Sequence, residues 1–394
     1  MFLLVNCAAC AAPLAHDAPR CVRCKTRYCN STCQHDHWRR GHKQICKKIY
    51  RGGNAEQYHA DKKYKEAVAV AVEACAADTK GQTCYICTEA LHWKTKEALV
   101  RGCACRRTSG FAHVSCLAEQ AKILVEEAEA NNLKEKFNER WMRWLACSLC
   151  EQQYHGFVAC ALGFACWKTY VGRSDEEFLP LQSAAMSALG FGLQSCGRPA
   201  DAIVAYEAVA SGEGSSDYAR VDTLNNIAVC LGETGKHEEA LSLRRRIYAI
   251  YKADRSRVPA TTYFSAADNL VNSLQVSGLF NESKTLLHDI VPEARRTLGP
   301  EAPLTLSLRR RCVSGLIHQS VIGPERIIPI DNLREAIALY EDIVPIYQRV
   351  FGSAHPETKK VHRSLVRARE NLATAPRVPL PVSRAAAGLA EEVD

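Results

Sequence analysis

Sixteen cysteine and histidine residues within the first 150 positions occur as eight closely spaced pairs. The first four pairs are Cys7/Cys10, Cys21/Cys24, Cys29/Cys33 and His42/Cys46, and the second four are Cys84/Cys87, Cys103/Cys105, His113/Cys116 and Cys147/Cys150. Zn²⁺ takes four thiolate or imidazole ligands, and two ligands two to four residues apart can reach one ion from a single turn. Four pairs make two complete sites. The sequence therefore predicts four Zn²⁺ ions in two double-zinc modules.

Length, cysteine usage and hydropathy restrict the class of protein. A chain of 394 residues is too long for one compact core, so several domains are expected. Met1–Val5 lacks the features of a signal peptide, and the longest apolar stretch, Phe157–Cys166, is far shorter than the roughly 20 residues of a membrane helix. Closely spaced cysteines in a reducing compartment are metal ligands. We therefore expect an intracellular, soluble protein without a membrane anchor, in the cytoplasm or the nucleus.

The net charge of +8 does not indicate nucleic-acid binding once the metal is included. Seven thiolates and two Zn²⁺ ions contribute a net charge of about −3 in each module, which takes the chain to about +2. Aromatic residues that could stack on bases are not interleaved with the basic ones. The basic residues of the first module are interpreted as a solvated helical face.

The predicted fold class is mainly α, with two small cross-brace double-zinc modules followed by an α-α solenoid. The expected boundaries are a first zinc module at 1–50, a helical linker at 51–82, a second zinc module at 83–156, a connector at 157–176, helical repeats at 177–373 and a disordered tail at 374–394. Within the second module, apolar residues of the insert 117–145 recur at helical spacing on either side of Asn131-Asn132. Two amphipathic helices are therefore expected there.

A turn signature repeats along the second half of the chain. Gly197–Ala202, Gly235–Ala240 and Gly278–Ser283 share the pattern Gly-x-x-x-[Asp/Glu]-[Ala/Ser], and Asn332–Ala336 opens a fourth second helix after an insertion around Pro324–Pro329. Small residues such as Gly190 and Ala202 are placed where paired helices approach. Such units must stack to bury their apolar faces. A generic helical bundle is the alternative.

This stretch resembles tetratricopeptide repeats of the kinesin light chain type, through Leu224–Ala228, Gly235–Ala240 and Phe351–Thr358. The resemblance implies a solenoid that binds a protein partner. Four asparagines on the first helices could then bond a peptide backbone, namely Asn225, Asn226, Asn269 and Asn272. The alternative is that they pack or cap helices.

The first zinc module resembles a MYND finger, through Tyr28-Cys29, Cys33-Gln34, Trp38 and His42-x3-Cys46. The resemblance implies interleaved sites, one made by Cys7, Cys10, Cys29 and Cys33 and the other by Cys21, Cys24, His42 and Cys46. His16, His35 and His37 compete with His42 for the ligand role, and the spacing favours His42. The resemblance also implies a groove for proline-rich peptides at Gln34 and Trp38, with Tyr28 as a further candidate. Alternatively, Trp38 forms the module's small core.

The second zinc module resembles the RING-CH class of RING domains, through Cys103-x-Cys105, His113-x2-Cys116 and Cys147-x2-Cys150. The resemblance implies a cross-brace in which Cys84, Cys87, His113 and Cys116 hold one ion and Cys103, Cys105, Cys147 and Cys150 the other. It also implies that Ile86 and Leu149 contact a ubiquitin-conjugating enzyme. Gln120 stands where the family usually has tryptophan, and Trp141 or Trp144 could supply the missing apolar surface.

Together these modules predict an adaptor-type ubiquitin ligase without a catalytic residue of its own, which acts by positioning the charged conjugating enzyme. The alternative is a non-enzymatic scaffold in which both zinc modules and the repeats bind peptides. A SET-domain methyltransferase is not expected, because no Asn-His-x-Cys cofactor motif is present. The apolar, proline-rich segment Val378–Val382 is a further candidate ligand for the groove of the first module.

Overall fold

The computed structural model describes residues 6–12, 14, 18–103, 105, 109–171, 179–210, 217–319, 329–353 and 356–374. All regular elements in these residues are helices, accompanied by three isolated β-bridges, so the predicted mainly α fold class is confirmed. The expected disordered tail, from residue 375 on, and most of the insertion around Pro324–Pro329 lie outside the described residues. The chain divides into two compact units, residues 1–243 and 244–394.

The first unit begins with the helices that follow the first cysteine pairs. α1 (Ser31–His37) continues through a π-helical turn (Trp38–His42) into α2 (Lys43–Arg51), and α3 (Ala55–Cys75) follows. Asn30 and Asn54 cap α1 and α3, because their side chains accept hydrogen bonds from the backbone N–H three residues later, at 3.0 and 2.9 Å. α3 occupies the region expected to be a linker, and it packs against α6 (Gly156–Tyr170).

The insert of the second zinc module forms two helices, as the spacing predicted. α4 (Val114–Ala130) ends before Asn132, which adopts a left-handed φ of 50°, and α5 (Lys134–Trp141) continues into a 3₁₀ turn at Met142–Trp144. A left-handed backbone stops a helix, and asparagine tolerates it better than most residues. The two helices pack against each other, and α4 also contacts α6.

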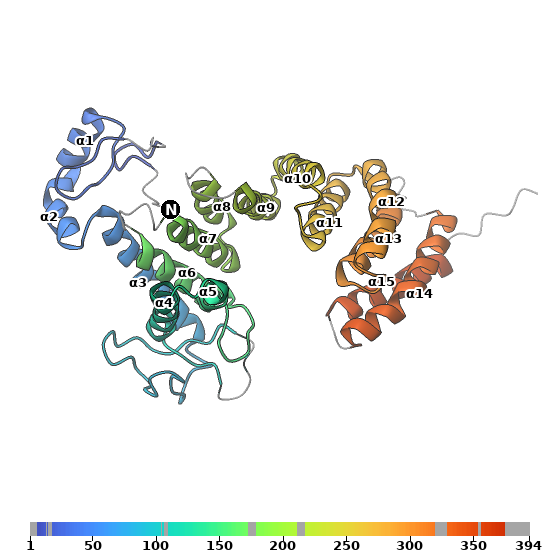
Figure 1. Cartoon of the computed structure of the whole chain (residues 1–394), viewed down its shortest axis with the longest axis horizontal. Helices are drawn as coiled ribbons and strands as arrows, with labels where there is room; N and C mark the ends of the chain where they lie inside the picture. The colour runs from blue at the N-terminus through green and yellow to red at the C-terminus, as the bar shows by residue number, and fades with distance from the viewer. Residues whose placement is uncertain are drawn as a thin grey trace, which may run out of the picture. The chain divides into compact units, whose positions relative to one another are not determined.

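Helix α6 is the most thoroughly buried helix of the first unit. It spans most of the region expected to be a connector, and it lies between α3 and α7 (Leu179–Ser195) (Figure 1). A Cβ on Gly192 of α7 would lie 2.5 Å from the Ala159 carbonyl oxygen, and one on Gly163 would lie 2.8 Å from that of Ala188. The backbones of α6 and α7 therefore touch directly, at a distance that only glycine permits.

The first repeats consist of α7, α8 (Pro199–Ala210), α9 (Asp217–Glu233) and the beginning of α10 (His237–Ala253). The turns predicted at Gly197 and Gly235 have φ angles of 78° and 81°, values that favour glycine. The residue after each glycine donates its N–H to a carbonyl of the preceding helix at 2.9 Å. Gly190 leaves room for the ring of Tyr206 on α8, which a Cβ would approach to 2.6 Å.

The second unit contains the rest of α10 and five further helices. These are α11 (Ala260–Val276), α12 (Phe280–Thr297), α13 (Pro303–Gln319), α14 (Ile330–Phe351) and α15 (Pro356–Thr374). The predicted fourth second helix is α14, and α15 packs along it around Tyr340, Ile343 and Leu365. Within the described residues, no helix combines the length and the apolar character needed to cross a membrane.

Candidate metal centres and interaction surfaces

Four clusters bring together all sixteen paired cysteine and histidine residues. Their members are Cys7, Cys10, Cys29 and Cys33; Cys21, Cys24, His42 and Cys46; Cys84, Cys87, His113 and Cys116; and Cys103, Cys105, Cys147 and Cys150. In each cluster the four ligand atoms lie within 4.8 Å of one another. The grouping is the interleaved one that the two resemblances implied. Sets of four thiolates, or of three thiolates and one imidazole, fit tetrahedral Zn²⁺.

One type of turn supplies one ligand pair of each cluster. It begins at Cys7, Cys21, Cys84 and Cys147, whose carbonyl oxygens accept a hydrogen bond from the N–H four residues later at 2.8–2.9 Å. The donor residue has a left-handed φ between 56° and 63° in all four turns. The backbone N–H of Ile86 and of Leu149 each lies 3.4 Å from the Sγ of the cysteine two residues earlier. Such N–H···S contacts favour the thiolate form that a metal requires.

A fifth turn of this form has no cysteine. The N–H of Lys96 donates to the His92 carbonyl at 2.9 Å, and Lys96 has a φ of 59°. The N–H and hydroxyl of Thr95 lie 3.1 and 2.9 Å from His92 Nδ1, where a second ligand would otherwise stand. The His92 ring also packs against the ring of His113 at 5.3 Å. Side-chain hydrogen bonds thus hold this turn in place of a metal, a feature that the sequence analysis missed.

Without a cation, the thiols of the first cluster compete for ionisation. Burial raises the pKa of Cys7, but hydrogen bonds from the backbone N–H groups of Cys10, Ala9 and Cys29 outweigh burial and lower the pKa to about 6. The side-chain hydrogen bond with Cys10, whose Sγ is 3.5 Å away, raises the pKa of Cys29 to about 12. A bound Zn²⁺ would supply the positive charge that allows all four thiolates to coexist.

His42 is the histidine that the structure places in the second cluster. Its Nε2 lies 3.3 Å from Cys24 Sγ, and the side chain is buried. The ring of His37 stacks on that of His42 at 4.8 Å, and its Nδ1 lies 3.0 Å from the Tyr28 hydroxyl. His35 is exposed, and His16 lies outside the described residues. His37 therefore supports the ligand His42 from outside the cluster.

The two groove residues expected in the first module are accessible. Trp38 is 39% exposed, with its ring edge-on to His42 at 5.8 Å, and Gln34 is partly exposed. The ring of Trp38 thus packs on His42 and stays partly exposed, and its role in a peptide groove stays a prediction.

Ile86 and Leu149 occupy equivalent positions in two zinc turns of the second module. They are 36% and 52% exposed. The Tyr85 hydroxyl lies 3.1 Å from Ser148 Oγ, so a hydrogen bond joins the residues that immediately precede them. This side-chain hydrogen bond therefore links the two turns that carry Ile86 and Leu149.

The two tryptophans of the insert pack against α6. Trp144 is 1% exposed and packs edge-on against Tyr170 of α6, and Trp141 lies 5.4 Å from the same ring. Trp144 is too buried to replace the helix tryptophan, so that part of the expectation is wrong, whereas the part that concerns the partly exposed Trp141 stays a prediction. Gln120 is partly buried. Trp93, which the sequence analysis did not select, is 68% exposed.

The four asparagines proposed to bind peptide have different environments. Asn226 lines a cavity of about 650 Å³ in the first unit. Asn272 accepts a hydrogen bond from Arg311 at 2.6 Å, and that guanidinium also pairs with Asp268. Asn225 and Asn269 already have interaction partners within the chain. Asn272 therefore matches the packing interpretation, whereas Asn226 remains available to a ligand.

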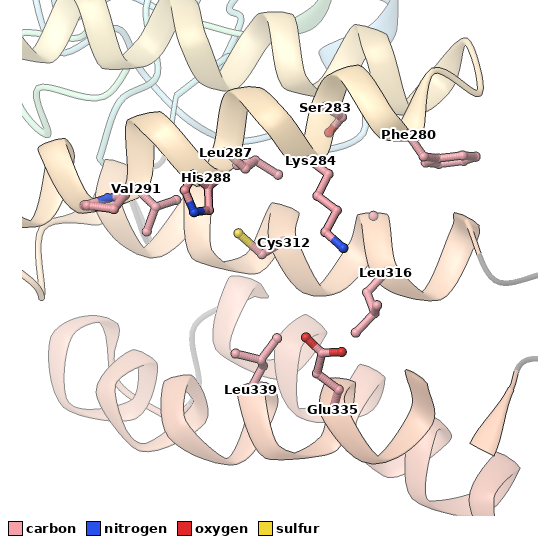
Figure 2. A pocket seen from close by; sticks show the side chains of 12 residues that line it. Phe280, Ser283, Lys284, Leu287, His288, Val291, Cys312, Leu316, Glu335 and Leu339 are labelled. Carbon is pink, nitrogen blue, oxygen red and sulfur yellow. The ribbon is translucent and has the colours of Figure 1, made fainter. Parts of the chain in front are cut away.

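A second cavity, of about 320 Å³, lies between α12, α13 and α14 (Figure 2). Leu287, Leu316 and Leu339 give it an apolar lining, and Lys284 and Glu335 extend toward it from opposite helices. Burial raises the pKa of Cys312 in its floor to about 11, so this thiol is not an activated nucleophile.

Comparisons with known families agree with two of the resemblances. The model of the MYND finger family matches residues 7–46, and that of a tetratricopeptide repeat matches 331–357. The chain thus contains a MYND finger and a tetratricopeptide repeat.

Curated relatives match only around the finger. Ubiquitin carboxyl-terminal hydrolase 17 of Arabidopsis thaliana is 44% identical over 54 residues, which are 14% of this chain and 7% of that protein. Ubiquitin C-terminal hydrolase 15 of Oryza sativa subsp. japonica is 52% identical over 42 residues, 10% of this chain and 4% of that protein. The chain thus spans less than a tenth of the length of these relatives.

One similar solved structure contains nearly identical TPR-like repeats of a putative kinesin light chain from Podosopora anserina. Its sequence is 21% identical to this chain and its TM-score is 0.38. The match covers 48% of this chain and 86% of that chain. The structure of BtubC (BKLC) from P. vanneervenii is also similar, at 11% identity and a TM-score of 0.35. The match covers 60% of this chain and 98% of that chain.

Proposed function

We propose that this protein is a zinc-dependent adaptor whose second zinc module recruits a charged ubiquitin-conjugating enzyme while its other modules hold protein ligands. MYND fingers and tetratricopeptide repeats are protein-interaction modules, which supports protein partners. The observation that supports the ligase activity most directly is the hydrogen bond between Tyr85 and Ser148, which fixes the exposed Ile86 and Leu149 on neighbouring turns. Zn²⁺, once bound, would hold both turns in shape.

The chain's own residues would act by positioning. Ile86 and Leu149 would bury apolar surface against the conjugating enzyme, and no side chain of this protein would form a covalent bond. Holding the thioester in a reactive geometry lowers the entropic part of the barrier to ubiquitin transfer. Loss of one buried anchor from a small interface costs about 1–3 kcal/mol.

Ubiquitin discharge from a panel of charged conjugating enzymes tests this activity. We expect the intact chain to accelerate discharge with at least one enzyme, and Ile86→Ala or Leu149→Ala to slow it by roughly 5- to 150-fold. Val22→Ala is the matched control, because Val22 is an exposed apolar residue in a zinc turn of the first module. An equal effect of all three changes would contradict the proposed contact surface.

The alternative function is a scaffold without ligase activity. The partly buried Gln120, in place of an exposed helix tryptophan, favours it. If protein shown to contain four Zn²⁺ accelerates discharge from no enzyme in the panel, the ligase function is excluded and the scaffold remains.

We further propose that the first module binds a proline-rich peptide at Gln34 and Trp38, with residues 378–382 of this chain as a competing ligand. Trp38→Ala should weaken binding of a labelled proline-rich peptide, while Ile45→Ala, at a similarly exposed residue of α2, should not. Removal of residues 376–394 should strengthen binding of the added peptide. Unchanged affinity after this truncation would rule out competition by the tail.

A further inference from the structure

A cavity of about 650 Å³ lies where the second zinc module meets the first helical repeats. One face of α7 contributes Ser187 and Phe191, at the i, i+4 spacing of a helix, and α9 contributes Asn226. The opposite wall consists of Trp141 and Leu145, which belong to the insert of the zinc module. The repeats therefore do not form this cavity alone.

The cavity wall formed by Trp141 and Leu145 is next in sequence to a metal cluster and is hydrogen-bonded to it. Leu145 lies two residues before the cluster member Cys147, and its carbonyl accepts a hydrogen bond from the Tyr154 N–H at 2.8 Å. Arg143 donates to the Cys147 carbonyl at 3.2 Å. The segment that positions Trp141 is thus held from one end by the turn around Cys147.

The same wall is also braced from behind by α6. The rings of Trp141 and Trp144 pack against Tyr170 at 5.4 and 6.0 Å. Tyr170 belongs to α6, and the backbone of α6 also contacts that of α7 at Gly163 and Gly192. Both groups of lining residues therefore contact α6, and the segment with Trp141 and Leu145 is also held by the turn at Cys147.

We propose that this cavity is one peptide site shared by the repeats and the second zinc module, and that ligand binding requires Zn²⁺ at Cys103, Cys105, Cys147 and Cys150. This rests on the proposed peptide-binding function of the repeats and assigns its regulation. Loss of the ion would release the turn at Cys147, and with it the wall formed by Trp141 and Leu145.

The lining defines the class of ligand. Trp141 and Phe191 provide an apolar surface for an aliphatic or aromatic side chain, and the amide group of Asn226 suits a peptide backbone. Asp222 is the charged side chain among the lining residues, and no cationic one is present there. The occupant is therefore an extended peptide with an apolar anchor that is neutral or basic rather than acidic.

The test selects a peptide from a phage-displayed library of nine-residue sequences on the zinc-loaded full chain, and then measures the affinity of that peptide by calorimetry. Trp141→Ala should weaken binding at least 10-fold without removing a metal ligand. Cys150→Ser should weaken binding by at least as much. Trp93→Ala is the matched control for tryptophan, because Trp93 is exposed in the same module outside the cavity lining, and Cys29→Ser is the control for a cluster of the first module. Both controls should bind as the parent chain does.

The outcomes separate this inference from the function on which it rests. If the selected peptide binds equally well to the parent, Trp141→Ala and Cys150→Ser proteins, the shared site is overturned, while peptide binding elsewhere on the chain stands. If the full chain selects no peptide, both the peptide-binding function and the shared site fail. A selected consensus rich in Asp and Glu would overturn the ligand class.

Discussion

At the scale of single residues, the zinc turns are defined by backbone geometry as much as by cysteines. The turn at His92 has the hydrogen bonds and the left-handed residue of the cysteine turns, although His92 and Thr95 stand at the ligand positions. The same backbone form therefore serves two purposes. With cysteines it presents Sγ atoms to a metal, and without them it supports His113 through ring packing.

The hydrogen bond between Tyr85 and Ser148 offers a test at this scale. We predict that Tyr85→Phe and Ser148→Ala each destabilise the second module by about 1 kcal/mol, because each removes one neutral hydrogen bond. Since both changes remove the same bond, the double variant should lose less than the sum of the two single losses. Urea denaturation of the three variants measures these values, and strict additivity would show that the two hydroxyls do not interact.

The thiol of Cys312 should react slowly with alkylating reagents. Burial disfavours its charged form and raises its pKa to about 11, and only the thiolate is nucleophilic. With an ordinary thiol pKa near 8.5, alkylation by iodoacetamide at pH 8 should be slower by roughly 200-fold than for the same residue in urea. Mass spectrometry of the Cys312 peptide at several pH values gives the profile, and a folded-state midpoint below pH 9 would contradict the prediction.

At the scale of elements, α6 connects the second zinc module to the repeats. Its interior residues are almost all buried, and it packs on α3, α4 and α7. Two glycines make the closest of these contacts possible, because any side chain at Gly163 or Gly192 would enter the backbone of the facing helix. Helix packing at this distance leaves no room for adjustment by side-chain rotation.

Gly192→Ala should therefore destabilise the first unit. The added Cβ would lie 2.5 Å from the Ala159 carbonyl oxygen, and overpacking of this kind costs about 1–3 kcal/mol. Gly232→Ala is the matched control, since Gly232 is a helical glycine with no atom within 4 Å of the new Cβ, and it should stabilise α9 by roughly 0.5–1 kcal/mol. Thermal unfolding measures both shifts, and equal midpoints for the two variants would exclude a direct contact between α6 and α7.

At the scale of the whole molecule, the four metal clusters found among the described residues lie in one of the two compact units. All four lie within residues 1–243, while the described part of residues 244–394 is held by apolar contacts between helices, such as those of Tyr340 and Ile343. The two zinc modules of this unit are short segments that fold together with their metal, because each lacks a sufficient hydrophobic core of its own. Stability should thus depend on zinc in one unit alone.

We predict two thermal transitions with different responses to a chelator. Addition of EDTA should lower the midpoint of the first unit by many degrees and leave that of the second unit unchanged. Differential scanning calorimetry resolves the two transitions, and tryptophan fluorescence follows the first, since all five tryptophans lie within the first unit. If both transitions shifted together, the two units would not unfold independently.

The sequence by itself determined the features that depend on local spacing. Ligand pairs such as Cys84 and Cys87 have to reach one ion from one turn, and the turns at Gly197 and Gly235 require a left-handed residue, so both are readable without a structure. Helical periodicity likewise predicted the two helices on either side of Asn131-Asn132. These signals are local because the geometry that they encode spans only a few residues.

Only the tertiary structure decided which surfaces face one another. The sequence offered Trp141 and Trp144 as substitutes for a helix tryptophan near the zinc turns, whereas packing on Tyr170 directs both toward α6 and places Trp141 in the cavity beside α7. It described residues 157–176 as a connector, although Gly163 and Gly192 make α6 a central packing helix. The direction of a side chain depends on contacts between residues far apart in the chain, which spacing along the sequence does not contain.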